Sequence, residues 1–226
     1  MRASDGGEWA RLGLAQRLTL ADCVGEVGCP QEESEVRSDV LVDGNLRLAD
    51  RWAMDFSAQL NNKAQFARRA VTSLRYSPSN YRTVSLALRT LKSTADVEQT
   101  EFVDLGWQWP VSDLWGADAQ DQGPGRGLGV GRWYSVGRVN YSVADRSVID
   151  LVAGFEYDGG CWVGRFVTSQ LQRGSEQKNI SYMFQLEFVG FSRLGVSPLQ
   201  TLRASVPRYQ YLREQVNPPS RFQQYD

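Results

Sequence analysis

The sequence has 226 residues, of which 42% are hydrophobic and 23% are charged, and its formal net charge is −1. These proportions exclude an intrinsically disordered chain, and the near-zero charge gives no reason to expect a nucleic-acid partner. Histidine is absent, which removes Ser-His-Asp and Cys-His nucleophile systems and the commonest metal ligand. We therefore expect no enzyme activity, no catalytic residues, no metal site and no cofactor.

The N-terminal residues MRASDGGEWA contain no apolar segment of the kind found in a secretory signal. No stretch approaches the roughly 20 consecutive apolar residues of a membrane helix. Membrane-spanning β-strands alternate polar and apolar residues, so the mean hydropathy of −0.41 fits a barrel as well as a soluble protein. For a protein that works outside the inner membrane, we expect this chain to be a fragment of a longer precursor.

Two of the three cysteines, Cys23 and Cys29, flank a short loop that ends at Pro30. With no histidine or third thiol nearby, the pair makes a poor metal site. Two alternatives remain for it: a local disulfide formed in an oxidising compartment, or two unpaired small residues in a variable loop. The odd cysteine count means that at least one thiol has no partner within the chain.

Apolar and polar residues alternate with a period of two through most of the chain. In one segment, Trp52, Met54 and Phe56 fall on one face, and Asp55 and Ser57 fall on the other. The pattern predicts about ten strands, at 8–20, 36–48, 51–61, 65–76, 80–92, 99–110, 132–143, 147–157, 161–172 and 180–191. Globular strands have about 5–6 residues, whereas tilted membrane strands need about 9–11. The predicted lengths therefore favour an all-β fold, an antiparallel transmembrane β-barrel segment of about ten strands.

The connections between the predicted strands give partial support to this topology. If the last strand ends in the periplasm, the connections at 48–50, 77–79, 111–131 and 158–160 are periplasmic. Barrels usually have short periplasmic turns and longer outer loops, a rule that the long 111–131 segment breaks. Aromatic residues gather at strand ends, as in the girdles of membrane barrels. They are Trp52, Tyr76, Tyr81, Trp107, Trp109, Trp133, Tyr134, Tyr157, Trp162 and Tyr182.

Two further patterns invite a catalytic or nucleotide-binding reading that the residues do not favour. The glycine-rich stretch 123–131 lacks the Gly-Lys-Ser/Thr ending of a phosphate loop and leads into a strand, so we interpret it as a flexible connection. Polar side chains on the predicted strands resemble catalytic pairs, but the inward face of a barrel is polar in any case. We predict that these polar residues face the lumen: Asp150, Glu156, Arg165, Gln185 and Glu187.

From about Trp107 onward the sequence carries several distinctive motifs in order. They are WQWPVSDLWG, GRWYSVGRVNYSVADR, SVIDLVAGFEYDGGCWVGRFV and FQLEFVGFSRLGVSPLQTLRASVPRYQ. Together they resemble the C-terminal end of the lipopolysaccharide-assembly outer-membrane proteins, also called organic solvent tolerance proteins (LptD). The resemblance is strongest over 99–212, and a weaker similarity in strand pattern extends to the start of the chain.

The resemblance implies roles for particular residues. In the family a cysteine pair often precedes the second-last strand and forms disulfides with the N-terminal periplasmic domain. Only Cys161 stands at that place here, which implies one disulfide to a cysteine outside this chain, with a free thiol as the alternative. The last strand resembles the family strand that borders a lateral seam, and its aromatic residues resemble the signal read by the barrel-assembly machinery. The seam residues are then Ile180, Tyr182, Phe184, Leu186, Phe188 and Phe191.

The resemblance also implies a function and a domain plan. Residues 1–192 would be the last strands of an outer-membrane barrel domain, and 193–226 a periplasmic C-terminal tail. The protein would be a translocon component that passes lipopolysaccharide through the barrel lumen and seam to the cell surface. Its partners would be lipopolysaccharide, the outer membrane, a plug lipoprotein, periplasmic lipopolysaccharide-bridge proteins acting through the missing N-terminal domain, and the barrel-assembly machinery. Two alternatives remain, a self-contained barrel enzyme and a soluble β-sandwich binding module.

Overall fold

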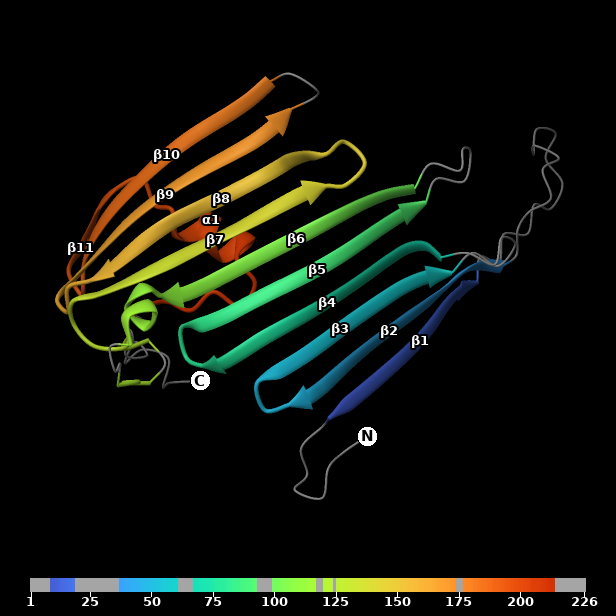
Figure 1. The fold of residues 1–226 in the computed structure, drawn as a ribbon, viewed down its shortest axis with the longest axis horizontal. Coiled ribbons are helices and arrows are strands. Elements are labelled where there is room, and N and C mark those ends of the chain that lie inside the picture. Colours follow the sequence, from blue (N-terminus) through green and yellow to red (C-terminus); the bar gives the residue numbers. More distant parts are fainter. Residues whose placement is uncertain are drawn as a thin grey trace, which may run out of the picture. The chain divides into compact units, whose positions relative to one another are not determined.

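The computed structural model describes residues 9–18, 37–60, 67–92, 99–116, 120–123, 125–173 and 177–213. These residues form eleven strands, which make one antiparallel sheet in chain order (Figure 1). The strands are β1 (Ala10–Leu18), β2 (Arg37–Ala49), β3 (Trp52–Leu60), β4 (Ala67–Ser79), β5 (Arg82–Lys92), β6 (Gln99–Pro110), β7 (Arg132–Ser142), β8 (Ser147–Asp158), β9 (Trp162–Arg173), β10 (Gln177–Phe188) and β11 (Ser192–Gly195). Cys23 and Cys29 lie outside the described residues.

The ten long strands confirm the all-β prediction. Strand β6 has the bounds expected from its alternation, 99–110. Strand β10 ends at Phe188 rather than at Phe191, because the chain reverses direction there and Gly190 takes a φ of 81°. That left-handed backbone conformation is readily available to glycine and ends the strand's alternation. None of the described helices is long and apolar enough to cross a membrane.

The chain divides into two compact units, and the first contains strands β1 to β3. Phe56 of β3 lies directly over Gly44 of β2, where a side chain would collide with its ring. On the opposite face of this strand pair, Asn45 donates a hydrogen bond to Asp55. The two faces of β1–β3 therefore separate apolar from polar side chains, although Gly44 is the only buried residue among those whose side chains are described.

The second unit contains strands β7 to β10 and the C-terminal segment that follows β11. In β8, Val152, Glu156 and Asp158 are buried, while Phe155 between them is exposed. This alternation defines an inner face, which carries the buried residues, and an outer face, which carries the exposed ones. We call residues 196–213 the tail.

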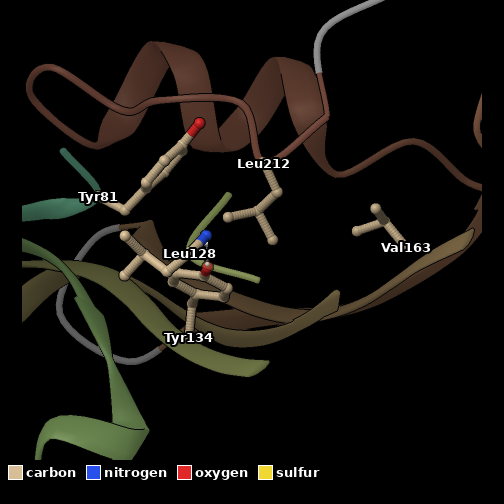
Figure 2. Packing of buried hydrophobic residues seen from close by; sticks show 5 residues of the cluster. All are labelled: Tyr81, Leu128, Tyr134, Val163 and Leu212. Carbon is tan, nitrogen blue, oxygen red and sulfur yellow. Dashed lines mark hydrogen bonds between the residues drawn. The ribbon is translucent and has the colours of Figure 1, made fainter. Parts of the chain in front are cut away.

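The tail lies on the inner face, where its short helix α1 (Leu199–Ser205) packs against β7 and β8 (Figure 1). Two side chains of the tail, Leu202 and Val206, are buried with Val136, Val152 and Val167 of strands β7, β8 and β9. Further along the tail, Leu212 is fully buried and points towards Leu128 and Tyr134 in Figure 2. Apolar burial of this kind stabilises the tail's position by about 25 cal/mol for each Å² removed from water.

The glycine-rich connection also has defined partners in its described part. The Tyr81 hydroxyl accepts hydrogen bonds from the backbone N–H groups of Arg126 and Gly127 at 3.0 Å and donates to the carbonyl of Gly123 at 3.2 Å. Tyr81 itself has a φ of 59°, an uncommon conformation for a residue with a side chain. We infer that these contacts hold the tyrosine in its strained turn. The loop is thus packed against the sheet rather than free of it.

Candidate functional site

Three strands place polar side chains in one row on the inner face. Glu156 of β8 lies opposite Arg165 of β9, which in turn lies opposite Gln185 of β10. The Arg165 guanidinium donates to Glu156 Oε1 at 2.8 Å and to Glu187 Oε2 at 2.6 Å. These three charged side chains are at most 2% exposed. The structure thus brings together four of the five residues predicted to face a lumen.

Burying these charges is costly, so each needs partners of opposite charge or hydrogen bonds. Arg193 of β11 donates to Glu187 Oε1 at 3.0 Å, which gives the cluster two guanidinium groups and two carboxylates. Four buried atoms still have no hydrogen-bond partner within the described part of the chain: Glu156 Oε2, Arg165 Nη2 and both amide atoms of Gln185. The row is balanced in charge and keeps unpaired donors and acceptors.

Tyr209 connects the tail to this row. Its hydroxyl donates to Glu156 Oε1 at 2.5 Å. Desolvation raises the pKa of Tyr209 well above its ordinary value, and the charge of Glu156 raises it further. The hydroxyl therefore keeps its proton and remains a donor to the carboxylate throughout the physiological pH range.

Two further attachments fix the tail. The side chain of Gln108 donates to the Gln210 carbonyl at 2.8 Å and accepts from its N–H at 2.9 Å. The Gln210 side chain in turn accepts a hydrogen bond from the backbone of Tyr81. Beyond it, Arg213 donates to both carboxylate oxygens of Asp158 at 3.1 Å. The tail is therefore held along its length by β6, β8 and the turn before β5.

The attachment of the tail was not predicted from the sequence. One local signal was available, because Leu199, Leu202 and Val206 have the spacing of one helix face. Pro198 immediately before them is a residue that helices accept at their start. No local signal identifies the partners, since Gln210 and Gln108 are 102 residues apart.

Another ion pair lies on the inner face, away from the charged row of Glu156, Arg165 and Glu187. Arg138 of β7 forms a bidentate pair with Asp104 of β6. Asp150, the fifth residue predicted to face a lumen, is half-buried and lies 3.7 Å from the Arg138 guanidinium. This cluster matches the pairing of opposite charges on neighbouring strands that is usual on polar sheet faces.

The outer face is apolar and aromatic. Phe155 lies opposite Phe166, which lies opposite Phe184, so three exposed phenylalanines form one row across β8, β9 and β10. Near the ends of these strands the aromatic rings contact one another. Ring centroids lie 4.8 Å apart for Trp133 and Tyr157, 5.1 Å for Tyr157 and Trp162, and 6.4 Å for Tyr76 and Trp109. Such a band suits the boundary between hydrocarbon and water.

The predicted seam residues fall into three groups. Ile180, Tyr182 and Phe184 are exposed along the part of β10 that, among the described residues, pairs only with β9. Leu186 and Phe188 belong to the segment Gln185–Phe188, whose other edge is paired with β11. Phe191 lies in the turn between these two strands and is exposed. Within the described part of the chain, strand β11, which was not predicted, thus leaves the first eight residues of β10 as an open edge.

Cys161 lies in the turn between β8 and β9, and its thiol is free and exposed. The carbonyl of Cys161 accepts a hydrogen bond from Val189 at 2.9 Å, which joins this turn to the end of β10. Within the described residues no cluster of three or more candidate ligands is present that would hold a metal ion. The disulfide to a cysteine outside this chain remains a prediction.

Comparison with known proteins identifies the family. The model of the LptD family, LPS transport system D, matches residues 1–115. The chain is 50% identical to the LPS-assembly protein LptD of Paracidovorax citrulli and 48% identical to that of Albidiferax ferrireducens. Each of these alignments covers 98% of this chain and 27% of the relative. A third relative, the LPS-assembly protein LptD of Bordetella parapertussis, is 31% identical over 99% of this chain.

The chain therefore spans about a quarter of the length of the curated relatives that it matches. The family model covers half of the chain, and the similarity to these relatives continues through the remainder. Together with the long antiparallel strands, this similarity shows that the chain belongs to the LptD family.

Proposed function

We propose that the chain is the C-terminal part of an outer-membrane translocon component that assembles lipopolysaccharide at the cell surface. The observation that carries this proposal is the similarity, over 98% of the chain, to relatives named LPS-assembly protein LptD. Its sheet supports the proposal, because strands of 9 to 13 residues with an apolar outer face are suited to crossing a membrane. In this proposal residues 1–192 belong to the barrel and 193–226 form a periplasmic tail.

The two chemical halves of lipopolysaccharide need different routes. The part of the polar inner face that the tail does not cover is suited to the glycan and to a plug lipoprotein within the lumen. Acyl chains avoid that route, because each CH₂ exposed to water costs roughly 0.8 kcal/mol. We assign their exit to the open edge of β10 beside Tyr182 and Phe184, where a strand from the rest of the polypeptide would complete the seam.

The remaining partners follow from the same proposal. Periplasmic lipopolysaccharide-bridge proteins would deliver the substrate through an N-terminal domain outside this chain. The barrel-assembly machinery would recognise the aromatic residues of β10, and Cys161 would form a disulfide with that N-terminal domain. None of these roles requires a catalytic group in this chain.

Depletion of the full-length protein tests the assembly function. Expression is placed under a repressible promoter, and the lipopolysaccharide in separated inner and outer membranes is measured as the protein disappears. We expect newly made lipopolysaccharide to accumulate in the inner-membrane fraction and its surface staining to fall. Continued delivery to the surface after depletion would show that another protein performs this step.

Photo-crosslinking tests the seam, with a control at the same height in the sheet. A benzophenone amino acid replaces Phe184 on β10 or Phe155 on β8 in the full-length protein. Both residues lie directly opposite Phe166, one on each side of β9, so they differ in distance from the open edge and not in depth. We expect position 184 to capture more newly made lipopolysaccharide than position 155. Equal capture at both positions would indicate ordinary contact with resident lipid and would contradict an exit at the open edge of β10.

A further inference from the structure

The short helix η1 (Val111–Trp115) follows β6 directly and contains no buried residue. It was not predicted from the sequence, which indicated only a long connection there. The chain enters it through the buried Pro110 and leaves it at Gly116, whose φ of 67° ends the turn. The Gly116 N–H donates to the carbonyl of Asp113 at 3.3 Å. Helix η1 is thus a single short turn of helix at the C-terminal end of β6.

A bidentate ion pair holds η1. The Arg82 guanidinium donates to Asp113 through Nε at 2.5 Å and Nη2 at 2.8 Å. The two side chains are 16% and 20% exposed, so the pair is partly shielded from water. Nη1, the third nitrogen of the Arg82 guanidinium, donates to the Ser79 hydroxyl at 2.9 Å, which fixes the guanidinium plane. This geometry is more specific than a single exposed ion pair.

The pair lies on the outer face of the sheet. A side chain added at Gly106 would meet Pro207 of the tail and Ser85 of β5, so Ser85 belongs to the inner face. Successive side chains along a strand alternate between faces. Thr83 therefore shares the inner face with Ser85, in agreement with its burial, and Arg82 points to the outer face. Because Asp113 is bound to Arg82, η1 is held at the outer side.

Two large apolar side chains of η1 extend from this place. Leu114 is 76% exposed and Trp115 is 75% exposed, although they are adjacent in sequence. The aromatic band of the outer face reaches the end of β6 from which η1 starts, since Trp109, two residues before η1, stacks on Tyr76. Exposed apolar side chains of the outer face are thus followed directly along the chain by those of η1. The turn between β7 and β8, by contrast, carries the charged residues Asp145 and Arg146.

We propose that η1 is an interfacial anchor, whose Leu114 and Trp115 insert into the headgroup region of a phospholipid leaflet. Tryptophan prefers this depth, because its ring is apolar and its N–H can remain hydrogen-bonded to water or headgroups. The Arg82–Asp113 pair holds the turn against the sheet, so that both side chains meet the lipid at a set height. The inference rests on the proposed function, since it requires the outer face to contact lipid.

Spin labelling of the full-length protein in phosphatidylcholine vesicles tests the anchor. A nitroxide is attached through a ketone-bearing amino acid, which leaves the native cysteines unmodified. Three single positions are compared: Trp115 in η1, Phe155 on the outer face of β8, and the exposed Ala144 in the turn after β7. Collision of each label with oxygen, which concentrates in lipid, and with a water-soluble nickel chelate is measured.

We expect the label at 115 to lose nickel accessibility relative to 144 and to lie at a shallower depth than 155. A label at 115 as accessible to nickel as that at 144, while 155 remains in lipid, overturns the anchor and leaves the barrel intact. Water accessibility at both 115 and 155 instead contradicts the lipid contact on which the proposed function depends. The two failures are therefore distinguishable.

A second variant tests the role of the ion pair. Asp113→Asn keeps the size of the side chain and removes the charge that binds Arg82. With the label at 115, we expect faster nitroxide motion and greater nickel accessibility than in the parent, because η1 is no longer held at the outer face. Unchanged motion and accessibility would show that the ion pair does not position the anchor.

Discussion

Strands β1–β3 and strands β8–β10 share one alternating pattern but differ in what covers their polar face. In β1–β3 the polar face carries Asn45 and Asp55, and Asp55 is 45% exposed. In β8–β10 the corresponding face carries Glu156, Arg165 and Glu187, which are almost fully buried. In both regions carboxylates lie beside cationic or amide partners, but these groups are exposed to water in β1–β3 and buried in β8–β10.

The tail accounts for the difference. It brings Tyr209 to Glu156 and buries Leu202 and Val206 against the inner face, which excludes water from the charged row. A charge in water loses little when its partner is removed, whereas a buried charge keeps its desolvation cost without compensation. Substitutions should therefore have large effects beneath the tail and small effects in β1–β3.

The largest effect is expected for Arg165→Met. The change keeps most of the side-chain volume but leaves Glu156 and Glu187 buried without their shared guanidinium. Breaking a buried ion pair in this way costs about 3–5 kcal/mol. We expect the folded, heat-modifiable gel band of the full-length protein to be lost at a clearly lower temperature.

A matched variant separates the charge effect from a packing effect. Adding Glu156→Gln and Glu187→Gln to Arg165→Met removes the two uncompensated carboxylates at nearly constant volume. Because a buried ion network contributes little net free energy as a whole, the triple variant should regain much of the lost stability. A triple variant no more stable than the single one means that the loss comes from packing, and the comparison fails.

A smaller effect is expected for Tyr209→Phe, which removes one hydroxyl from the tail. The variant leaves Glu156 Oε1 without this donor, a loss of about 1–3 kcal/mol in the docking of the tail. The measurement is the mobility of a nitroxide at Gln200, an exposed position on α1. We expect a larger mobile fraction in the variant near neutral pH, while Arg208→Ala, which removes an exposed tail side chain, should leave it unchanged.

The same label reports a pH dependence. In the docked tail the pKa of Tyr209 is raised, whereas a free phenol titrates at about 10. The docked state therefore holds its proton to a higher pH than the released state. The stabilisation of the docked tail by the Tyr209 hydroxyl is complete below about pH 10 and declines as the pH rises towards the raised pKa. Tyr209→Phe should lack this decline, and equal pH profiles for the two proteins would exclude Tyr209 as its source.

The strands of both regions were predictable because their alternation is local. Strand β6 was expected and found at 99–110, and the pattern also placed Glu156 and Arg165 on one polar face. Their direct opposition depends on register, which the turn between β8 and β9 sets and the alternation alone does not reveal.

The parts that escaped prediction depend on distant partners. Tyr209 meets Glu156 across 53 residues, so no local pattern marks either side chain as the other's partner. Strand β11 has only four residues, too few for an alternation to be recognised. Helix η1 is similarly short, and its position depends on Arg82, which lies 31 residues before Asp113. Local propensity identifies strands, whereas the covering of a face depends on long-range contacts.

The smallest effect is expected for Asp55→Asn in β3. Arg75 lies 3.7 Å from the Asp55 carboxylate, and both side chains remain accessible to water. An exposed pair of this kind contributes about 0–1 kcal/mol, and the introduced amide still offers an oxygen to Asn45. The gel transition of the full-length variant should stay close to that of the parent, whereas Glu187→Gln, the same carboxylate-to-amide change beneath the tail, should lower it. Because both substitutions change a carboxylate to an amide, equal losses would mean that burial by the tail does not set the cost.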